Sequence, residues 1–383
     1  MPLTLILLLL AQDQQIGART KAMGGSYTAF EDDPVSVWLN PAGIATQPDA
    51  LSVTYQSYTL YELEFSPPST FDVPAETGWS DPPIIPSYLG LVFQLGHGET
   101  DHAIGICFAA PFRNRYVVIN TDLVVSQFDQ AFYRFRVAYA YDLRFKPKGE
   151  TGFLTHLSFG LGLDLSVTSW RADGIFGFNP FTDEISVGFN DTGFGGGAGL
   201  LLGLYDNAST LRVNFGIAYQ SRVNYKFSIS QSVVPTSDWP NQVNTGFTLY
   251  LLDGLPLRVT LDMQWIGWDL STHDSDIAGF DDFDDVFNYS LGVEYRFKVS
   301  DNVRIFPRAG VRIHQSPWTD EDNPPAIGNQ TLLIEPRNNR YLIGSVGVGV
   351  GWTTAGGKQR MVDVAFDFGA DAPGFAFGFT MEF

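Results

Sequence analysis

Hydrophobic and polar residues alternate along most of this chain. From Phe375 to Phe383, Phe or Met occupies every second position, and Gly, Ala, Thr or Glu fills the positions between. The same period of two recurs at 289–298, where Tyr, Leu, Val and Phe face one way and Ser, Glu, Arg and Lys the other. Successive side chains of a β-strand point to opposite faces, so the pattern predicts strands with one apolar face.

Segments with this alternation recur from residue 50 to the end of the chain. The run at 210–230 is about three times longer than a typical soluble strand, as expected of a strand that projects beyond a membrane. An even number of antiparallel strands closes a membrane barrel. The fourteen segments are 50–64, 84–96, 101–110, 129–145, 153–170, 184–204, 210–230, 242–252, 255–269, 286–298, 303–315, 339–353, 359–368 and 374–383.

The connections between the segments alternate in length. Those after the even-numbered segments are short, at 97–100, 146–152, 205–209, 253–254, 299–302 and 354–358. Those after the odd-numbered segments are mostly long, at 65–83, 111–128, 171–183, 231–241, 270–285 and 316–338. Outer-membrane barrels have short periplasmic turns and long external loops. The sequence therefore predicts an all-β fold, a transmembrane antiparallel β-barrel of about fourteen strands, over residues 49–383.

Residues before the first strand do not alternate. The apolar run within 1–11 is too short to span a bilayer and is typical of a secretory signal peptide; a buried N-terminal strand is the alternative. In 12–48, Asp33-Pro34 is typical of a helix start and Asn40-Pro41 of a helix end. A helical segment ahead of a closed barrel has the lumen to occupy, so we expect 12–48 to form a small plug, or hatch, there.

Composition agrees with a barrel and excludes several other classes. Charged residues make up 17% of the chain, against the usual quarter, and aromatic residues 14%. No run of about 18 apolar residues predicts a transmembrane helix. The net charge of -19 argues against a nucleic-acid partner. Cys107 is the only cysteine, which excludes an intrachain disulfide and a multi-cysteine metal site.

Four stretches of the chain carry recognisable motifs. They are Met23-Gly24-Gly25 with Asp32-Asp33 and Asn40-Pro41-Ala42-Gly43, then Pro86 to Phe112, then Trp239-Pro240 leading into 243–269, and Gly310 to Trp318. In this order and spacing they resemble the fatty-acid transporter (FadL/TodX) family. The resemblance covers nearly the whole chain.

The family resemblance implies a location and a function. We expect a bacterial outer-membrane protein, in contact with lipid and lipopolysaccharide, that takes up long-chain fatty acids or other hydrophobic molecules passively. Its hatch would comprise Met23, Gly24, Gly25, Asp32, Asp33, Asn40, Pro41, Ala42 and Gly43. The N-terminal stretch alone also resembles PorV/PorQ-type proteins. The alternative is therefore a non-transporting partner of a secretion or surface-assembly system.

Alternation also places charged side chains on the lumen face. The basic set is Arg134, Arg136, Arg212, Arg222, Arg258, Arg296, Arg304, Arg308 and Arg312. An Arg fork binds a carboxylate with two bonds. We predict a fatty-acid carboxylate site at Arg308 and Arg312, because Phe306 and His314 share their face, and Arg134 is a further candidate. A salt-bridged interior that stiffens the barrel is the alternative reading.

The third predicted strand, at 101–110, is a candidate for a lateral opening in the wall. It is short, contains Gly105, and runs into Pro111, which cannot donate a ladder hydrogen bond. The family resemblance implies a kink at this strand. The alternative is that Pro111 only ends the strand where a loop begins.

The remaining motifs predict no catalysis and no cofactor. The five histidines are scattered, and neither G-x-S-x-G nor H-E-x-x-H occurs. The stretch 269–285 holds seven aspartates, but the EF-hand spacing is absent. A solvated external loop, or cation-bridged contact with lipopolysaccharide phosphate, explains it without a dedicated metal site.

Overall fold

The structure, a computed structural model, contains one large sheet and a short helical N-terminal segment. It describes residues 15–30, 32–57, 63–66, 86–96, 100–120, 124–147, 150–176, 183–207, 209–225, 239–251, 256–267, 285–315, 326–327, 330–331, 333–336, 340–369 and 374–383. The large sheet comprises β1 (Ala50–Gln56), β3 (Tyr88–Gln94), β4 (Thr100–Asn120), β5 (Val124–Arg144), β6 (Gly152–Phe176), β7 (Asp183–Asn207), β8 (Leu211–Gln220), β9 (Asn241–Leu251), β10 (Leu257–Gly267), β11 (Val286–Tyr295), β12 (Phe297–Lys298), β13 (Val303–Gln315), β17 (Arg340–Thr353), β18 (Gln359–Phe368) and β19 (Phe375–Glu382).

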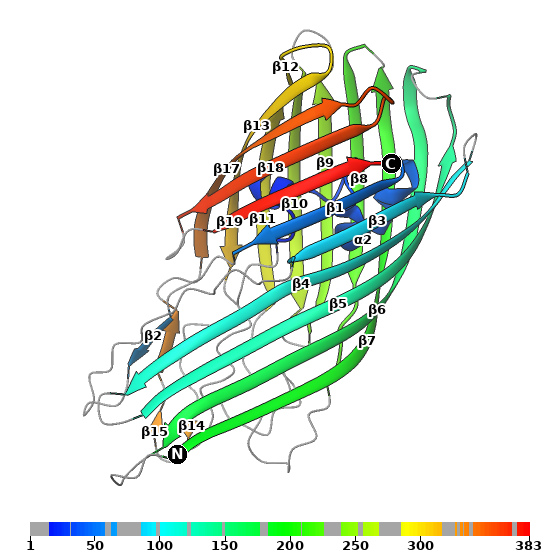
Figure 1. Cartoon of the computed structure of the whole chain (residues 1–383). Helices are drawn as coiled ribbons and strands as arrows, with labels where there is room; N and C mark the ends of the chain where they lie inside the picture. Colours follow the sequence, from blue (N-terminus) through cyan, green and yellow to red (C-terminus); the bar gives the residue numbers. More distant parts are fainter. Residues whose placement is uncertain are drawn as a thin grey trace.

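These strands form a closed antiparallel barrel (Figure 1). Each strand pairs with the next along the chain, and β1 pairs with β19 from Ala50↔Glu382 to Gln56↔Ala376. Because β11 and β12 both pair with β13 and follow each other along one line, they occupy a single place in the wall. The wall therefore has fourteen positions, which confirms the predicted transmembrane barrel.

The predicted short connections are confirmed as well. The long connection predicted at 111–128 was wrong, because β4 extends to Asn120 and β5 begins at Val124, and several other strand boundaries differ from those predicted. The short turns join β3 to β4, β5 to β6, β7 to β8, β9 to β10, β12 to β13 and β17 to β18, and they share what we call the short-turn end of the barrel. The third predicted strand continues to Asn120, whereas the run at 210–230 leaves the wall after Gln220. The first, predicted to reach 64, ends at Gln56.

Four short strands, in two pairs, lie outside the wall sheet. β2 (Leu63–Ser66) pairs with β16 (Leu333–Pro336), so two connections that are far apart in sequence meet there. β14 (Ala326–Ile327) and β15 (Gln330–Thr331) form a hairpin of their own. The sequence did not predict these short pairings, because two to four residues carry no measurable period.

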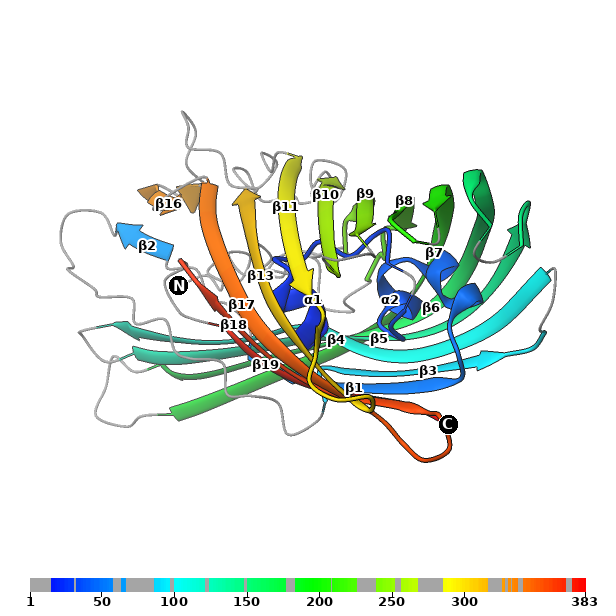
Figure 2. The same cartoon turned by 90° about the horizontal axis from the view of Figure 1, so that it is seen from above.

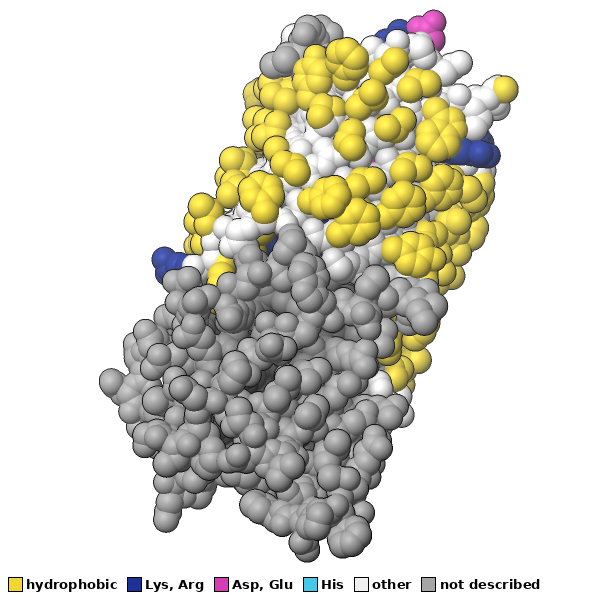
Figure 3. All heavy atoms as spheres, turned by 60° about the vertical axis from the view of Figure 1, so that its left-hand side comes forward, with side chains coloured by type: hydrophobic (Ala, Val, Ile, Leu, Met, Phe, Trp, Pro, Cys, Tyr) yellow, Lys and Arg dark blue, Asp and Glu magenta, His cyan; other side chains and the backbone are white. Residues whose placement is uncertain are grey.

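The outer surface of the barrel is apolar. On β6, Leu161 is 66% exposed and Leu163 79%, and on β7 Phe194 is 80% exposed. Figure 3 shows hydrophobic side chains spread over much of the described part of the face that it draws. Water would not stabilise so large an exposed apolar surface, whereas a bilayer would. The closed barrel with its apolar band is therefore a transmembrane protein of the outer-membrane type.

The N-terminal segment, residues 15–49, lies inside the ring of strands (Figure 2). It contains α1 (Ala18–Ala22), α2 (Ser36–Leu39) and the 3₁₀ helix η2 (Pro41–Thr46). α1 packs on β13 and β17 to β19, whereas η2 packs on β4 to β7, so the segment crosses the lumen. No helix in the described part of the chain is long and apolar enough to cross a membrane. The predicted signal peptide, 1–11, lies outside the described residues.

Candidate functional site

Buried ion pairs hold the N-terminal segment against the wall. Glu294 on β11 accepts hydrogen bonds from Arg19 of the segment (3.0 Å) and from Arg308 on β13 (2.6 Å). Arg308 also donates to Asp363 on β18 (2.5 Å). All four side chains, here called the Glu294 cluster, are more than nine-tenths buried. Because a buried charge is stable only with its partner, this cluster strongly favours the docked position of α1.

A second group of ion pairs binds the other side of α1. Lys21 donates to Asp367 on β18 (2.6 Å), and Arg312 on β13 reaches the same carboxylate (3.3 Å). Ser345 on β17 donates to the second oxygen of Asp367 (2.7 Å). Arg312 also donates to the side-chain oxygen of Gln15 (3.0 Å). Both groups of ion pairs therefore join the N-terminal segment to the wall.

These contacts favour the salt-bridged alternative for Arg308 and Arg312 over the predicted carboxylate site. The guanidinium groups of Arg308 and Arg312 both bond protein carboxylates, as the salt-bridged alternative requires. Phe306 stacks on Arg308 at 5.7 Å, while His314 and Arg312 line a separate small cavity. The structure thus divides the four residues into two places. Protein carboxylates therefore already bind the guanidinium groups of Arg308 and Arg312.

The motif Asp32-Asp33 places two carboxylates in different environments. Asp32 accepts bonds from Arg258 on β10 (2.8 Å) and Arg19 (3.2 Å). Burial alone would raise the pKa of Asp32, but these two cations lower it to about 2. Asp33 accepts one backbone bond, from Val35 (3.0 Å), and burial raises its pKa to about 6. Asp32 is thus a fixed charge, whereas Asp33 titrates near neutrality.

We expect Asp33→Asn to strengthen docking of the N-terminal segment at pH 8 and to change little at pH 4. A raised carboxyl pKa means that docking is weakened as the pH rises from 3.8 to about 6, and remains weaker above that. Asn removes the titration and keeps an acceptor for Val35. Protease cleavage of the segment, followed from pH 4 to 8, measures docking. An identical pH profile for variant and wild type would contradict the prediction.

The remaining motif residues of the segment are also in the lumen. Met23 is buried, and Gly24 (φ +67°) and Gly25 (φ +92°) make the turn after α1. A side chain at Gly24 would lie 2.8 Å from the backbone of β13, so the turn sits directly on the wall. Asn40 accepts from the Ala42 N–H (3.2 Å) and donates to the Thr28 carbonyl (2.7 Å). Pro41, Ala42 and Gly43 then form the buried first turn of η2.

A third charged group lies on β5 and β6. Asp164 accepts two short bonds from Arg136 (2.6 and 2.8 Å) and one long contact from Arg134 (3.5 Å). The side chains of all three are fully buried, and one carboxylate serves two guanidinium groups. The Arg134 guanidinium carbon lies 4.3 Å from the ring centre of Trp239 and 5.6 Å from that of Trp38. Within the described residues, Nε and Nη2 of Arg134 form no hydrogen bond.

Aromatic side chains surround Arg134. Trp38 of α2 meets Trp239 edge-on at 6.4 Å, and Phe132 of β5 lies 6.0 Å from Trp239 and 5.7 Å from Tyr225. We call these four residues the aromatic cluster. It is continuous with a larger buried apolar group that includes Val37 and Ile44 of the segment and Tyr88, Val92 and Cys107 of the wall. An apolar region therefore extends from the wall to the N-terminal segment.

Tyr225 of the aromatic cluster and its neighbour Val223 lie where the sequence did not predict them. Val223 and Tyr225 were expected on the outer face, continuing the alternation of β8. Instead, both are buried, at 0% and 1% exposure. After Ser221, which donates to Gly196 of β7, the chain turns into the lumen, and Val223 and Trp239 exchange backbone hydrogen bonds (2.9 and 3.0 Å). Neither Trp38 nor Trp239 was predicted as a site residue, although both stand outside the alternating segments.

The predicted lateral opening at Gly105 and Pro111 is only partly consistent with the structure. Gly105 is paired on both sides, with Val92 and Ala138, so the ladder is not broken there. Its missing side chain instead admits Val37 of the segment, which a Cβ would approach to 2.6 Å. Pro111 does not end the strand, but the pairing with β5 shifts between Ala109 and Phe112. The irregularity is a bulge at Pro111 in a long strand.

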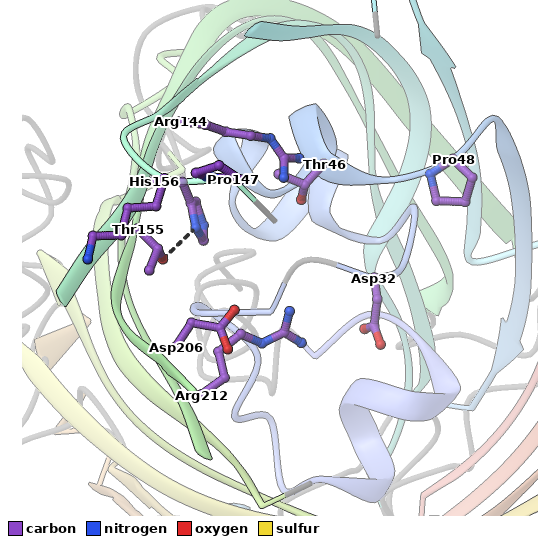
Figure 4. A pocket seen from close by; sticks show the side chains of 10 residues that line it. Asp32, Thr46, Pro48, Arg144, Pro147, Thr155, His156, Asp206 and Arg212 are labelled. Carbon is purple, nitrogen blue, oxygen red and sulfur yellow. Dashed lines mark hydrogen bonds between the residues drawn. The ribbon is translucent and has the colours of Figure 1, made fainter. Parts of the chain in front are cut away.

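A cavity of about 180 Å³ lies under the segment at the short-turn end (Figure 4). Asp32, Thr46 and Pro48 of the segment line it, with wall residues of both charges. The wall residues are Arg144, Lys146, Pro147, Thr155, His156, Asp206 and Arg212. Arg144 is bonded to Asp101 (2.7 Å).

No cluster of three or more His, Cys, Asp or Glu side chains suited to a metal is found among the described residues. In the aspartate-rich stretch 269–285, only Asp285 is described, and it accepts a bond from the Trp265 indole (2.9 Å). The suggested contact of this loop with lipopolysaccharide therefore stays a prediction.

Comparison with known proteins gives structural matches and no sequence matches. No family model matches the chain, and no curated protein matches it. A Pseudomonas aeruginosa FadL homologue superimposes with a TM-score of 0.62 at 14% identity, over 97% of this chain and 98% of that one. The chain has the FadL fold. The Pseudomonas putida toluene transporter TodX matches at TM-score 0.55, 12% identity and 97% and 98% coverage, and the Ralstonia pickettii toluene transporter TbuX at 0.55, 15%, 96% and 97%.

Proposed function

We propose that the chain is a bacterial outer-membrane channel for the passive uptake of hydrophobic molecules, with the N-terminal segment as its hatch. The observation that carries the proposal is the apolar region that reaches from the wall to the segment. A lumen filled only by ion pairs would offer a hydrophobic molecule no favourable contact. Here the ion pairs to the segment lie on β10, β11 and β18, while most wall residues of the apolar region belong to β3, β4 and β5. The fold shared with two toluene transporters supports the same function.

The proposal includes a gain in free energy for the ligand. Transfer of apolar surface out of water contributes about 25 cal/mol per Å², and aromatic rings provide large rigid contact areas. Trp38 belongs to the segment and Trp239 to the inward-turned chain, so movement of either would open space between them. A ligand could then lie between the two indole rings. It would contact both rings in place of the contact that they make with each other.

We further propose that Arg134 binds the carboxylate when the ligand is a fatty acid. Among the three arginines predicted as ligand residues, Arg134 has the longest ion-pair contact, 3.5 Å to Asp164, because Asp164 is already doubly bonded to Arg136. A guanidinium with unused N–H groups inside an aromatic cluster fits a carboxylate attached to an apolar chain. Arg134 thus replaces Arg308 and Arg312 as the favoured ligand residue among those that the sequence predicted.

We expect Arg134→Ala to weaken the binding of dodecanoate by about 1.5–3 kcal/mol and that of dodecane hardly at all, because only the carboxylate loses a charged hydrogen bond. Binding to the purified protein, by competition with a fluorescent probe, measures both. An equal loss for the two ligands would show that the variant damages the lumen and does not remove a carboxylate contact.

The channel itself is tested by a double variant, Trp38→Ala with Trp239→Ala, which should weaken binding of both ligands. Trp352→Ala is the matched control, because Trp352 lies at the end of β17 and outside the apolar region. If wild-type protein binds neither ligand, the non-transporting partner of a secretion system becomes the better proposal.

The route out of the lumen remains a proposal. The bulge at Pro111 supports a lateral exit into the bilayer beside β4, because Pro cannot donate to the ladder and the pairing with β5 shifts there. Direct exit into the bilayer also avoids the cost of exposing an apolar molecule to water.

A further inference from the structure

Part of the connection between β8 and β9 lies inside the lumen. It comprises residues 221–225 and Trp239, and we call it the strap. Val223 and Trp239 pair as an antiparallel bridge, with backbone hydrogen bonds of 2.9 and 3.0 Å. Because this pair joins the two arms of the strap to each other, both arms can move together without breaking it.

Contacts at the wall end of the strap define a hinge. The Ser221 N–H donates to the Gly196 carbonyl of β7 (2.9 Å), and the Gly196 N–H donates to the Ser221 hydroxyl (2.8 Å). The Arg222 N–H donates to the side chain of Asn241, the first residue of β9 (2.8 Å). The strap is therefore fixed to the strands on either side at Ser221 and Arg222, and the chain turns inward beyond them.

The inner part of the strap fills a slot in the wall. Val223 is completely buried, and its two methyl groups lie over Gly193 and Gly195 of β7. A Cβ would approach these methyl groups to 2.4 Å at Gly193 and to 2.7 Å at Gly195, so the two glycines give the valine its room. Because valine carries no charge, moving it out of the slot breaks packing contacts and no ion pair.

The strap and the N-terminal segment face each other across the aromatic cluster. Arg134 on β5 lies against Trp239 of the strap and donates to the Tyr225 hydroxyl. Arg136, two residues nearer the short-turn end of β5, donates to the Trp38 carbonyl of the segment (2.7 Å). A molecule that approaches from the end opposite the short turns therefore meets the strap before the segment.

The two sides of the cluster differ in what their movement would break. Movement of the segment breaks the bond from Arg136 to Trp38 and the buried ion pairs of α1, and a buried charge that loses its partner is strongly unfavourable. Movement of the strap breaks the bonds of the Tyr225 hydroxyl to Ser166 and Arg134, while Arg134 keeps its ion pair with β6. The strap therefore opens at a lower cost than the segment.

We propose that the strap is the gate of the aromatic cluster. It turns about Ser221 and Arg222 and leaves its slot, while α1 stays docked. This movement separates Trp239 from Trp38 and exposes Arg134, so that the carboxylate of a fatty acid can take the place of the Tyr225 hydroxyl. The inference rests on the proposed function and deepens it, because it assigns the moving part and explains how a buried arginine becomes accessible.

Two matched disulfides in the full-length protein test the gate, with Cys107 replaced by Ala in both. Gly193→Cys with Val223→Cys joins the strap to the wall. Ala18→Cys with Gly378→Cys joins α1 to β19, where the two Cβ positions lie 3.1 Å apart. In detergent, the oxidised strap disulfide should weaken binding of dodecane and dodecanoate at least roughly tenfold, because the open state is no longer populated. Reduction should restore binding, and the oxidised α1 disulfide should leave it as in wild type.

Val223→Ala tests the gate without a disulfide. It removes the two methyl groups that fill the slot, so the closed strap is less stable and dodecane should associate roughly three to ten times faster. Val346→Ala is the matched control, because Val346 lies on the outer face of β17 and is 45% exposed.

Full binding by the oxidised strap variant, or an unchanged association rate in Val223→Ala, would overturn the gate and leave the uptake channel standing. Loss of binding in the oxidised α1 variant would overturn it too, since α1 would then have to move. If wild-type protein binds neither dodecane nor dodecanoate, the proposed function itself fails, and the gate fails with it.

Discussion

Deletion of residues 17–45 should leave a folded barrel that conducts ions far better than the full-length chain. The segment fills the lumen, and its residues from Ile16 to Ala45 are mostly buried there. None of the fourteen wall positions includes it, and every strand pairing of the wall lies outside it. Closure of the ladder should therefore not require the segment, whereas occlusion of the lumen does.

The charges left behind in the wall also have partners after the deletion. Glu294 retains Arg258 (3.3 Å) and Arg308 (2.6 Å), and Arg308 retains Asp363. Asp367 loses Lys21 but retains Arg312. Water entering the open lumen would solvate the remainder, so we expect a moderate loss of stability and an intact barrel.

Two measurements check this prediction on the same protein. The heat-dependent shift in mobility on a gel reports a folded barrel, and the conductance of single molecules in a planar bilayer reports the open lumen. A truncated protein that forms no heat-resistant barrel would mean that the segment is part of the wall's stability and not a separate plug. Unchanged conductance would mean that other residues close the lumen.

Strand positions could be predicted from the sequence because one physical rule fixes them all. Lipid on one side and a polar lumen on the other impose a period of two, and short turns at one end fix the order of the hairpins. The rule fails where the chain leaves the wall. Val223 and Tyr225 continue the alternation of β8 into the lumen, because a buried aromatic cluster selects the same residues as lipid does. Periodicity cannot distinguish those two apolar environments.

The candidate site was harder to predict. Alternation shows on which face of the wall a side chain lies, but it does not show which residue the side chain pairs with. Alternation placed Arg134, Arg308 and Arg312 correctly in the lumen. It did not show which of these arginines is neutralised by a protein carboxylate. The pairing of Arg308 with Glu294 could have been predicted, because the short turn at 299–302 places the two residues opposite each other. Partners from the N-terminal segment, such as Lys21, which pairs with Asp367, could not be predicted. No local sequence pattern relates α1 to β18. Tertiary contacts across a lumen leave no period in the sequence.

Replacing Glu294 by Gln should release the N-terminal segment while the barrel stays folded. Glu294 is the carboxylate on which Arg19, Arg258 and Arg308 converge, and it is only 2% exposed. Removing one partner of a buried ion pair costs about 3–5 kcal/mol, because the charges that remain are left uncompensated. Arg308 and Arg258 still reach Asp363 and Asp32, and Arg19 keeps Asp32, which belongs to the segment itself. The loss therefore falls mainly on the attachment of α1 to the wall.

The rate at which a protease cleaves the N-terminal segment measures this release, and bilayer conductance shows whether the lumen opens with it. Asp301→Asn is the matched control, since the Lys298–Asp301 pair (2.8 Å) is 63% and 93% exposed and should matter little. We expect Glu294→Gln to raise cleavage by two orders of magnitude or more, given about 1.4 kcal/mol for each factor of ten, and the control to behave as wild type. Equal cleavage in both variants would show that the Glu294 cluster does not hold the hatch. The ion pairs of Asp367 with Lys21 and Arg312, on the other side of α1, would then be the stronger attachment. Lys21→Met would have to produce the effect instead.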